Sequence, residues 1–103
     1  MRIIAKSTLR EFWRSHKDAE QPLKEWHQEA SKAKWKSPNE VKSQFGNVSV
    51  IGKKRLVFNI AGNKYRLIVA TNFQFQCFYI CFIGTHKQYD TINAEEVWSN
   101  DSN

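Results

Sequence analysis

The chain has 103 residues, of which 41% are hydrophobic and 25% charged, a composition typical of one globular domain with a modest core. Sixteen Lys and Arg against ten Asp and Glu give a net charge of +6, which favours a polyanion or an acidic protein as partner. No apolar run approaches the roughly 20 residues of a membrane span, and the first residues lack the apolar length of a secretory signal. We therefore expect a cytoplasmic protein without membrane contact.

Helical spacing dominates the first half of the chain. Ile3 and Ile4 predict a short first strand, and Ser7 is a candidate N-cap for a helix over residues 8–16. A second helix is predicted over residues 22–34, because its apolar residues recur on one face and Pro22 suits its first turn. A short helical turn is predicted over residues 40–44.

The period changes to two after Val48, which indicates strands. Three are predicted, over residues 55–60, 65–70 and 77–83, followed by a polar segment over residues 85–90. Residues 1–98 are expected to form one domain in which Ile92, Val97 and Trp98 dock a last turn or strand. Residues 99–103 are expected to be a mobile polar tail.

Helices followed by a meander of strands predict an α+β domain, with N-terminal helices packed on one face of a small twisted antiparallel sheet. The other face is expected to be open to solvent or a ligand. Cys77 and Cys81 lie four residues apart on one predicted strand, about 13 Å, too far for a disulfide. This spacing fits a reducing compartment.

Alternation along the three strands assigns side chains to the two faces of the sheet. The helix side is assigned the more apolar sets, Leu56, Phe58, Ile60, Tyr65, Leu67, Val69, Phe78, Ile80 and Phe82. The open face is assigned Arg55, Val57, Asn59, Arg66, Ile68, Ala70, Cys77, Tyr79, Cys81 and Ile83. Lys53 and Lys54 lie where the first of these strands begins.

Arg66 is the most informative residue on the predicted open face, because it interrupts an apolar strand. An arginine in the middle of a sheet needs an anionic partner or open solvent. An ion pair with an Asp or Glu side chain would explain the position of Arg66 as well as an anionic ligand would. Arg55 nearby favours a phosphate site, because guanidinium groups grip phosphate oxygens in a bidentate manner. Lys53, Lys54, Arg55 and Asn59 are thus candidate RNA- or phosphate-binding residues.

His86 and Tyr89 follow the third strand, where the chain leaves the arginine face. His86 can take or give a proton near neutral pH, and Tyr89 can donate a hydrogen bond or a proton. A loop histidine is more often simply a surface residue. Together with Arg66, however, these residues suit RNA cleavage by the RNA's own 2′-hydroxyl group. Arg66, His86 and Tyr89 are the candidate catalytic residues, and neither a metal nor another cofactor is implied.

Three blocks of the sequence resemble the HigB toxin family. They are residues 55–60 (RLVFNI), 62–69 (GNKYRLIV) and 82–90 (FIGTHKQYD), and the opening Met1–Trp13 and Trp26 are also similar to that family. The resemblance implies a RelE-like fold and an mRNA interferase, an endoribonuclease that cuts translated mRNA on the ribosome without a metal. It implies neutralisation by a HigA-type helix-turn-helix antitoxin, with operator DNA bound only through the toxin–antitoxin complex.

By the same resemblance Arg66 binds the phosphate, and His86 and Tyr89 form the acid/base and positioning pair. Members of the family often carry a basic residue where this chain has Cys81. The absence of a cation there predicts a slower enzyme, or one that uses Lys53, Lys54 or Arg55 instead.

Two other readings fit the same residues. The first is a non-catalytic RelE/ParE-like toxin or RNA- or ribosome-binding module, in which the basic, aromatic-rich face serves binding alone. Such a protein would inhibit translation or replication and leave messages intact. The second is a structural partner of an acidic protein, which the net charge of +6 favours and which is compatible with nuclease activity.

Overall fold

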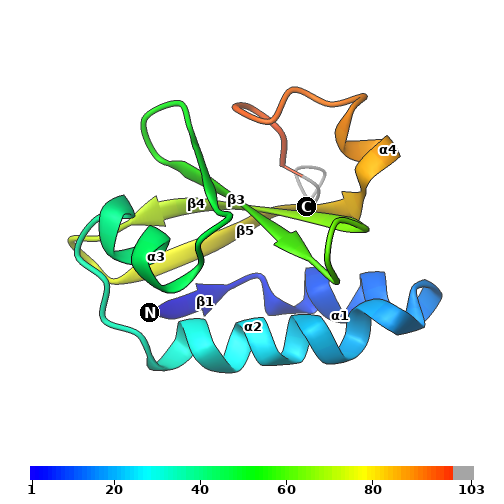
Figure 1. The fold of residues 1–103 in the computed structure, drawn as a ribbon, viewed down its shortest axis with the longest axis horizontal. Helices are drawn as coiled ribbons and strands as arrows, with labels where there is room; N and C mark the ends of the chain where they lie inside the picture. The colour runs from blue at the N-terminus through cyan, green and yellow to red at the C-terminus, as the bar shows by residue number, and fades with distance from the viewer. Residues whose placement is uncertain (99–103) are drawn as a thin grey trace.

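The computed structural model describes residues 1–98, so the expected tail at 99–103 lies outside the described residues. Figure 1 shows two helices beneath a twisted sheet, with the C-terminal segment above it. The elements are β1 (Arg2–Ile4), α1 (Lys6–Ser15), the 3₁₀ turn η1 (Lys17–Ala19), α2 (Glu20–Lys32), α3 (Pro38–Gln44), β2 (Ser49–Ile51), β3 (Arg55–Ile60), β4 (Tyr65–Asn72), β5 (Cys77–Thr85) and α4 (His86–Tyr89). The prediction of an α+β domain with N-terminal helices on one face of the sheet is confirmed.

The five strands are ordered β1-β5-β4-β3-β2. Strands β2 to β5 form the predicted antiparallel meander, whereas β1 pairs in parallel with β5 at the edge. The sheet is therefore mixed. A parallel pair needs a long crossover, and the connection from β1 to β5 contains α1, η1, α2, α3 and the strands β2 to β4.

The first helix does not have the side-chain N-cap that the sequence predicted. Ser7 lies inside α1, and the N-cap position is taken by Ala5 in a left-handed conformation (φ 71°, ψ 39°) without a side-chain cap. The helical turn predicted over residues 40–44 is present as α3, but it begins two residues earlier at Pro38, because the Ser37 side chain accepts a hydrogen bond from the Glu40 amide. None of the helices in residues 1–98 is long and apolar enough to cross a membrane.

The main core lies between the helices and the sheet and is built largely from rings. Trp26 on α2 meets Phe58 on β3 edge to face, with ring centroids 5.3 Å apart, and Phe45 contacts the same ring at 5.2 Å. Trp35 stacks on Phe78 of β5 at 5.7 Å. These contacts fix α2 and the residues before α3 against the sheet, as the aromatic content of the sequence indicates.

A second, smaller core covers part of the face that was predicted to be open. It consists of Val57, Ile68, Cys81 and Phe82, with Ile51, Ala70, Tyr89, Ile92, Ala94 and Val97 packed against it. The prediction of an open second face is therefore wrong for this part of the sheet. The chain after α4 folds back over it because Ile92, Ala94 and Val97 have apolar surface to bury. The predicted docking of Ile92 and Val97 is confirmed, whereas Trp98 lies outside this core and is 43% exposed.

A register shift in β5 changes which side chains reach that second core. Ile68 pairs with Phe82 while its neighbour Val69 pairs with Ile80, so Cys81 is the extra residue of a β-bulge. Phe82 then joins the second core and Ile83 joins the helix side, the reverse of the alternation prediction. Strict alternation fails here because one inserted residue exchanges the faces of all residues that follow it.

Asp18 in η1 connects the helical layer to β4. Its carboxylate accepts hydrogen bonds from the Lys64 ammonium group, at 2.6 Å, and from the Tyr65 hydroxyl group. The hydrogen bonds from Lys64 and then Tyr65 lower the pKa of Asp18. The hydrogen bond to Asp18, with burial as a smaller cause, raises the pKa of Tyr65 to about 12.

We expect Asp18→Asn to return the pKa of Tyr65 toward 10, because the charge that opposes phenolate formation is removed. In the wild type, the stabilisation carried by Tyr65 is complete below about pH 10 and is lost as the pH rises toward 12. The stabilisation contributed by Asp18 is present above about pH 4 and is lost as the pH falls through the lowered pKa of its carboxyl group. Ultraviolet titration at 295 nm tests this: three wild-type tyrosines ionising together near pH 10 would contradict it.

Candidate functional site

Arg66 lies on β4, on the same sheet face as the second core but beyond its end. Its neighbours in register are Asn59 on β3 and Gly84 on β5. The side chain is partly exposed, and its Nη1 donates to the carbonyl oxygens of Asn63, at 3.0 Å, and Tyr65, at 3.3 Å. Within residues 1–98 no carboxylate forms an ion pair with Arg66. The remaining guanidinium donors have no hydrogen-bond partner among residues 1–98, so they can bind an anion.

Helix α4 starts at His86, two residues after Gly84, the register neighbour of Arg66 on β5. Its N-cap is Thr85, whose hydroxyl accepts from the Gln88 amide at 3.0 Å, while Gln88 Oε1 accepts from the Thr85 amide at 2.9 Å. This reciprocal capping box fixes a helix of only four residues. The His86 amide also donates to the Lys64 carbonyl at 3.0 Å, which ties α4 to the strand that carries Arg66.

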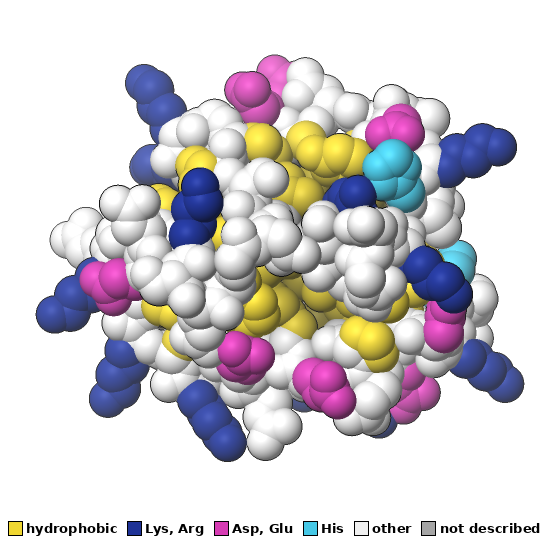
Figure 2. All heavy atoms as spheres, viewed as in Figure 1, with side chains coloured by type: hydrophobic (Ala, Val, Ile, Leu, Met, Phe, Trp, Pro, Cys, Tyr) yellow, Lys and Arg dark blue, Asp and Glu magenta, His cyan; other side chains and the backbone are white. Residues whose placement is uncertain are grey.

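His86 is exposed on α4, and its Nδ1 lies 3.5 Å from Asp90 Oδ2. Because both side chains are largely solvated, this contact orients the imidazole ring without contributing much stability. Figure 2 shows a histidine, a carboxylate and basic side chains together over the end of the molecule where α4 lies. Tyr89, one turn after His86, is half-buried and packs against the second core.

The structure brings together four of the predicted site residues, Asn59, Arg66, His86 and Tyr89, around one end of the sheet. Asn59 pairs with Arg66 in register, and its amide donates to Asn63 Oδ1 at 3.3 Å. Lys53 and Lys54 instead lie exposed in the β2–β3 turn. From Lys54 to Asn59 the strand runs five residues, or about 17 Å, so these lysines lie outside the Arg66 cluster.

Arg55 occupies a different place from the one predicted. It is only 8% exposed, and its Nη1 donates to the carbonyl oxygens of Ala94, at 2.9 Å, and Val97, at 2.8 Å. Its guanidinium carbon lies 4.9 Å from the ring centroid of Trp98. The expected solvent-facing position is therefore wrong, because the C-terminal segment covers Arg55. We call these contacts the Arg55 clasp.

Cys81 is fully buried at the bulge, beneath the C-terminal segment. Burial raises the pKa of its thiol, with a smaller opposing effect of Arg55, so the group is neutral at physiological pH. Cys77 and Cys81 are both free, which confirms that they form no disulfide. A cation at position 81 would have to enter this apolar core, so in this fold Cys81 is a packing residue.

Sequence reasoning missed three features of the site. Asp90 was not recognised as the partner of His86, although the four-residue spacing on a helix would have indicated it. The Thr85-x-x-Gln88 pattern is a capping box, and it identifies α4 where only a polar segment was predicted. Gly84 leaves room for the Phe82 ring and the Gln88 amide, a packing requirement that the sequence does not reveal.

We expect Gly84→Ala to destabilise the fold and to disturb α4. An added Cβ would lie 2.5 Å from Phe82 Cζ and 2.8 Å from Gln88 Oε1, so the ring or the capping amide must move. Overpacking of this kind costs about 1–3 kcal/mol. Urea unfolding should show this loss, with Gly46→Ala as the control, since a Cβ there meets nothing within 4 Å. Equal stability of the two variants would contradict it.

Within residues 1–98, His, Cys, Asp and Glu side chains form no group of three or more suited to a metal ion. The site thus consists of one arginine with free donors, a histidine paired with a carboxylate, a tyrosine and an asparagine. Such a set can hold a phosphate group and move protons next to it.

Comparison with known proteins gives one consistent result. Over residues 19–92 the chain matches the HigB toxin family, the RelE-like toxic component of a toxin-antitoxin system. It is similar to mRNA interferase toxin HigB of Escherichia coli strain K12, with 27% identity over 96 residues that cover 91% of this chain and 92% of the relative. Proteins named mRNA interferase HigB from Escherichia coli O157:H7 and Shigella flexneri match with the same identity and coverage. The family match spans well over half of the sequence, including Arg66, His86 and Tyr89, and the chain therefore belongs to the HigB family of RelE-like toxins.

Proposed function

We propose that this toxin is an endoribonuclease that cuts mRNA while it is translated on the ribosome. The observation that carries the proposal is the position of Arg66. Its register neighbour is Gly84, which comes two residues before His86, and some of its guanidinium donors have no partner in residues 1–98. The names of the relatives, mRNA interferases, give the same class of activity. A net charge of +6 suits an RNA substrate.

In the proposed reaction the 2′-oxygen of the RNA attacks the adjacent phosphorus and the bond from phosphorus to the 5′-oxygen breaks. One proton leaves the 2′-hydroxyl group and one is delivered to the 5′-oxygen, so the products are a 2′,3′-cyclic phosphate and a 5′-hydroxyl end. Arg66 binds the phosphate oxygens and stabilises the added charge of the transition state. In this proposal, side chains of the protein bind the phosphate and carry out both proton transfers.

His86 and Tyr89 are the proposed acid/base and positioning residues. The contact of Nδ1 with Asp90 leaves Nε2 of His86 as the nitrogen that can exchange a proton with the RNA. Tyr89 lies on the same turn, held by the second core, and its hydroxyl group can position the substrate or donate a proton. Asn59, the register neighbour of Arg66, is proposed to bind a phosphate or sugar oxygen, and Lys53 and Lys54 are proposed to contact RNA farther along the strand.

The toxin is proposed to act in the cytoplasm, where mRNA and ribosomes meet. A HigA-type antitoxin with a helix-turn-helix domain is the proposed neutralising partner, and operator DNA is reached only through the toxin–antitoxin complex. The excess of basic side chains on the toxin favours acidic surface on that antitoxin.

The test is 5′-end mapping of a defined message in a purified bacterial translation system, with and without ribosomes. We expect cuts within translated codons that carry 5′-hydroxyl ends and that disappear when ribosomes are omitted. Inhibited translation with an intact message would instead establish the non-catalytic binding module. Cuts that carry 5′-phosphate ends would exclude attack by the 2′-hydroxyl group, and cuts without ribosomes would exclude strict ribosome dependence.

A further inference from the structure

We propose that the groove between α1 and α2 is a binding site for a nucleotide, with the phosphate group held by Lys6 and Arg10 and the base against Trp13. The groove belongs to the helical layer, beneath the sheet in Figure 1, whereas α4 and the C-terminal segment lie above it. It is therefore separate from the candidate catalytic site, and the proposal does not depend on the nuclease activity.

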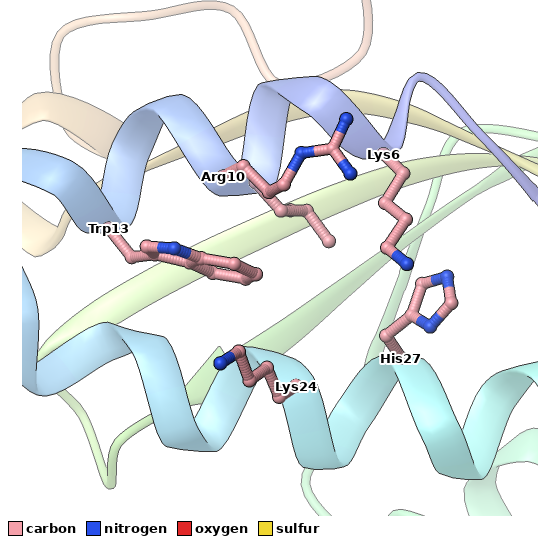
Figure 3. Close-up of a pocket in the computed structure, with 6 residues that line it drawn as sticks. Lys6, Arg10, Trp13, Lys24 and His27 are labelled. Carbon is pink, nitrogen blue, oxygen red and sulfur yellow. The ribbon is translucent and has the colours of Figure 1, made fainter.

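The lining of the groove is strongly basic. Its residues are Lys6, Leu9, Arg10, Trp13, Lys24 and His27, so two lysines, one arginine and one histidine line it, without a carboxylate among the lining residues. Figure 3 shows the side chains of Lys6 and Arg10 from α1 and of Lys24 and His27 from α2 around one hollow, with the Trp13 ring at one end. Like charges that line one groove repel each other, and an anion bound among them relieves that repulsion.

The cations differ in how far they are already neutralised. Lys24 donates to Glu20 Oε2 at 2.6 Å and lies 5.5 Å from the Trp13 ring centroid. Lys6 and Arg10 form no ion pair with a carboxylate in residues 1–98. They are four residues apart on α1, so they present their charges on the same side of the helix. An oxyanion is expected to bind between these two side chains, and Arg10 can hold it with two parallel hydrogen bonds.

The pKa of His27 depends on its burial and on the positive charge in the groove. Burial, followed by the charge of Lys6, lowers the pKa of its imidazole, so it is neutral at neutral pH in the empty groove. The charged groups that line its surroundings are Lys6 and Arg10 on α1 and Lys24 on its own helix. A phosphate placed among them must raise the pKa of His27, because it offsets the charge that disfavours protonation.

Size and shape favour a nucleotide over an acidic helix. The hollow has a volume of about 330 Å³, which fits the lower end of the range for small-molecule sites, about 300–1,000 Å³. The hydrophobic residues that line the groove are Leu9 and Trp13. Leu9 is only 1% exposed, so a ligand would contact mainly the partly exposed Trp13 ring. A helix that docks in a groove needs a row of apolar contacts, whereas one flat ring is sufficient for a stacked base.

The experiment is an NMR titration of the whole protein with adenosine 5′-monophosphate, adenosine and inorganic phosphate, followed on the ring protons of its three histidines. We expect the monophosphate to shift the His27 signal and to raise its pKa, with little change at His86. Adenosine and phosphate should each bind about tenfold or more weakly, since each lacks one of the two contacts. A His27 signal that none of the three ligands moves would overturn the proposal.

Matched variants locate the site. Arg10→Ala should weaken binding of the monophosphate about tenfold, whereas Arg14→Ala, an exposed arginine one turn along the same helix, should leave it unchanged. Trp13→Phe should weaken it less than Trp13→Ala, and both variants should bind inorganic phosphate as the wild type does. Equal loss in the two arginine variants would overturn the proposal, as would tighter binding of an acidic helical peptide at His27. Binding abolished by Arg66→Ala would place the nucleotide in the candidate catalytic site instead.

Discussion

Arg66→Ala is expected to lower the rate of mRNA cleavage at least about a hundredfold while the protein remains folded. The side chain is partly exposed and bonds only to carbonyl oxygens of its own turn, Asn63 and Tyr65, so its removal leaves the two cores intact. Losing one preorganised donor to a developing oxyanion typically lowers the rate by about 10²–10³. The measurement is single-turnover cleavage of a programmed message on purified ribosomes.

Three further variants make this result specific. Arg66→Lys should recover part of the rate, since it keeps the charge but loses the bidentate geometry. Arg14→Ala removes an exposed arginine on α1 and serves as the control for net charge. His86→Ala should lower the rate by about 10²–10⁴, the range of general acid–base catalysis. Full cleavage by both Arg66→Ala and His86→Ala would refute this site assignment.

Arg55→Ala is expected to produce the largest loss of stability among the single basic residues considered above. The guanidinium of the Arg55 clasp is 8% exposed and donates to the carbonyls of Ala94 and Val97, so truncation leaves both without their charged donor. We expect unfolding in urea to show a loss of about 2–4 kcal/mol. The stability of Arg55→Lys should fall between those of the wild type and Arg55→Ala, because an ammonium group keeps the charge but cannot reproduce the planar contact with Trp98.

Thiol labelling gives an independent measure of the clasp. When the C-terminal segment loosens, Cys81 beneath it should react with a thiol reagent faster than in the wild type, in a Cys77→Ser background. Lys54→Ala, an exposed neighbour, is the control that should change neither stability nor labelling. If Arg55→Ala weakens RNA binding while stability and labelling stay unchanged, Arg55 binds phosphate, as the sequence suggested, and the clasp has no structural role.

Much of the fold could be predicted because it depends on local periodicity. The spacing of apolar residues located α2, β3, β4 and β5 to within a few residues, and the shift from period 3.6 to period two indicated an α+β domain. The strand position of Arg66 between apolar neighbours also followed from the sequence. In the same way, residues 85–90 stood out because His86 and Tyr89 come directly after a strand.

The predictions that were wrong concern features that depend on contacts between residues distant in sequence. The bulge at Cys81 exchanges the faces of Phe82 and Ile83, and it arises from pairing between strands that no single segment specifies. The docking of residues 92–97 over the second face turned Arg55 from an expected ligand-binding residue into a buried one.

The sequence by itself determined the composition, the charge, the type of each main element and the residue types available for phosphate chemistry. The tertiary structure alone decided which of the basic side chains are free. Arg66 keeps donors without a partner in the described part of the chain, whereas the segment after α4 returns over Arg55 and its carbonyl oxygens accept hydrogen bonds from that guanidinium. It also brought Lys6, Arg10 and Lys24 into one groove from two helices. The physical reason is that burial and charge proximity depend on the packing of distant segments, whereas periodicity is a property of each segment alone.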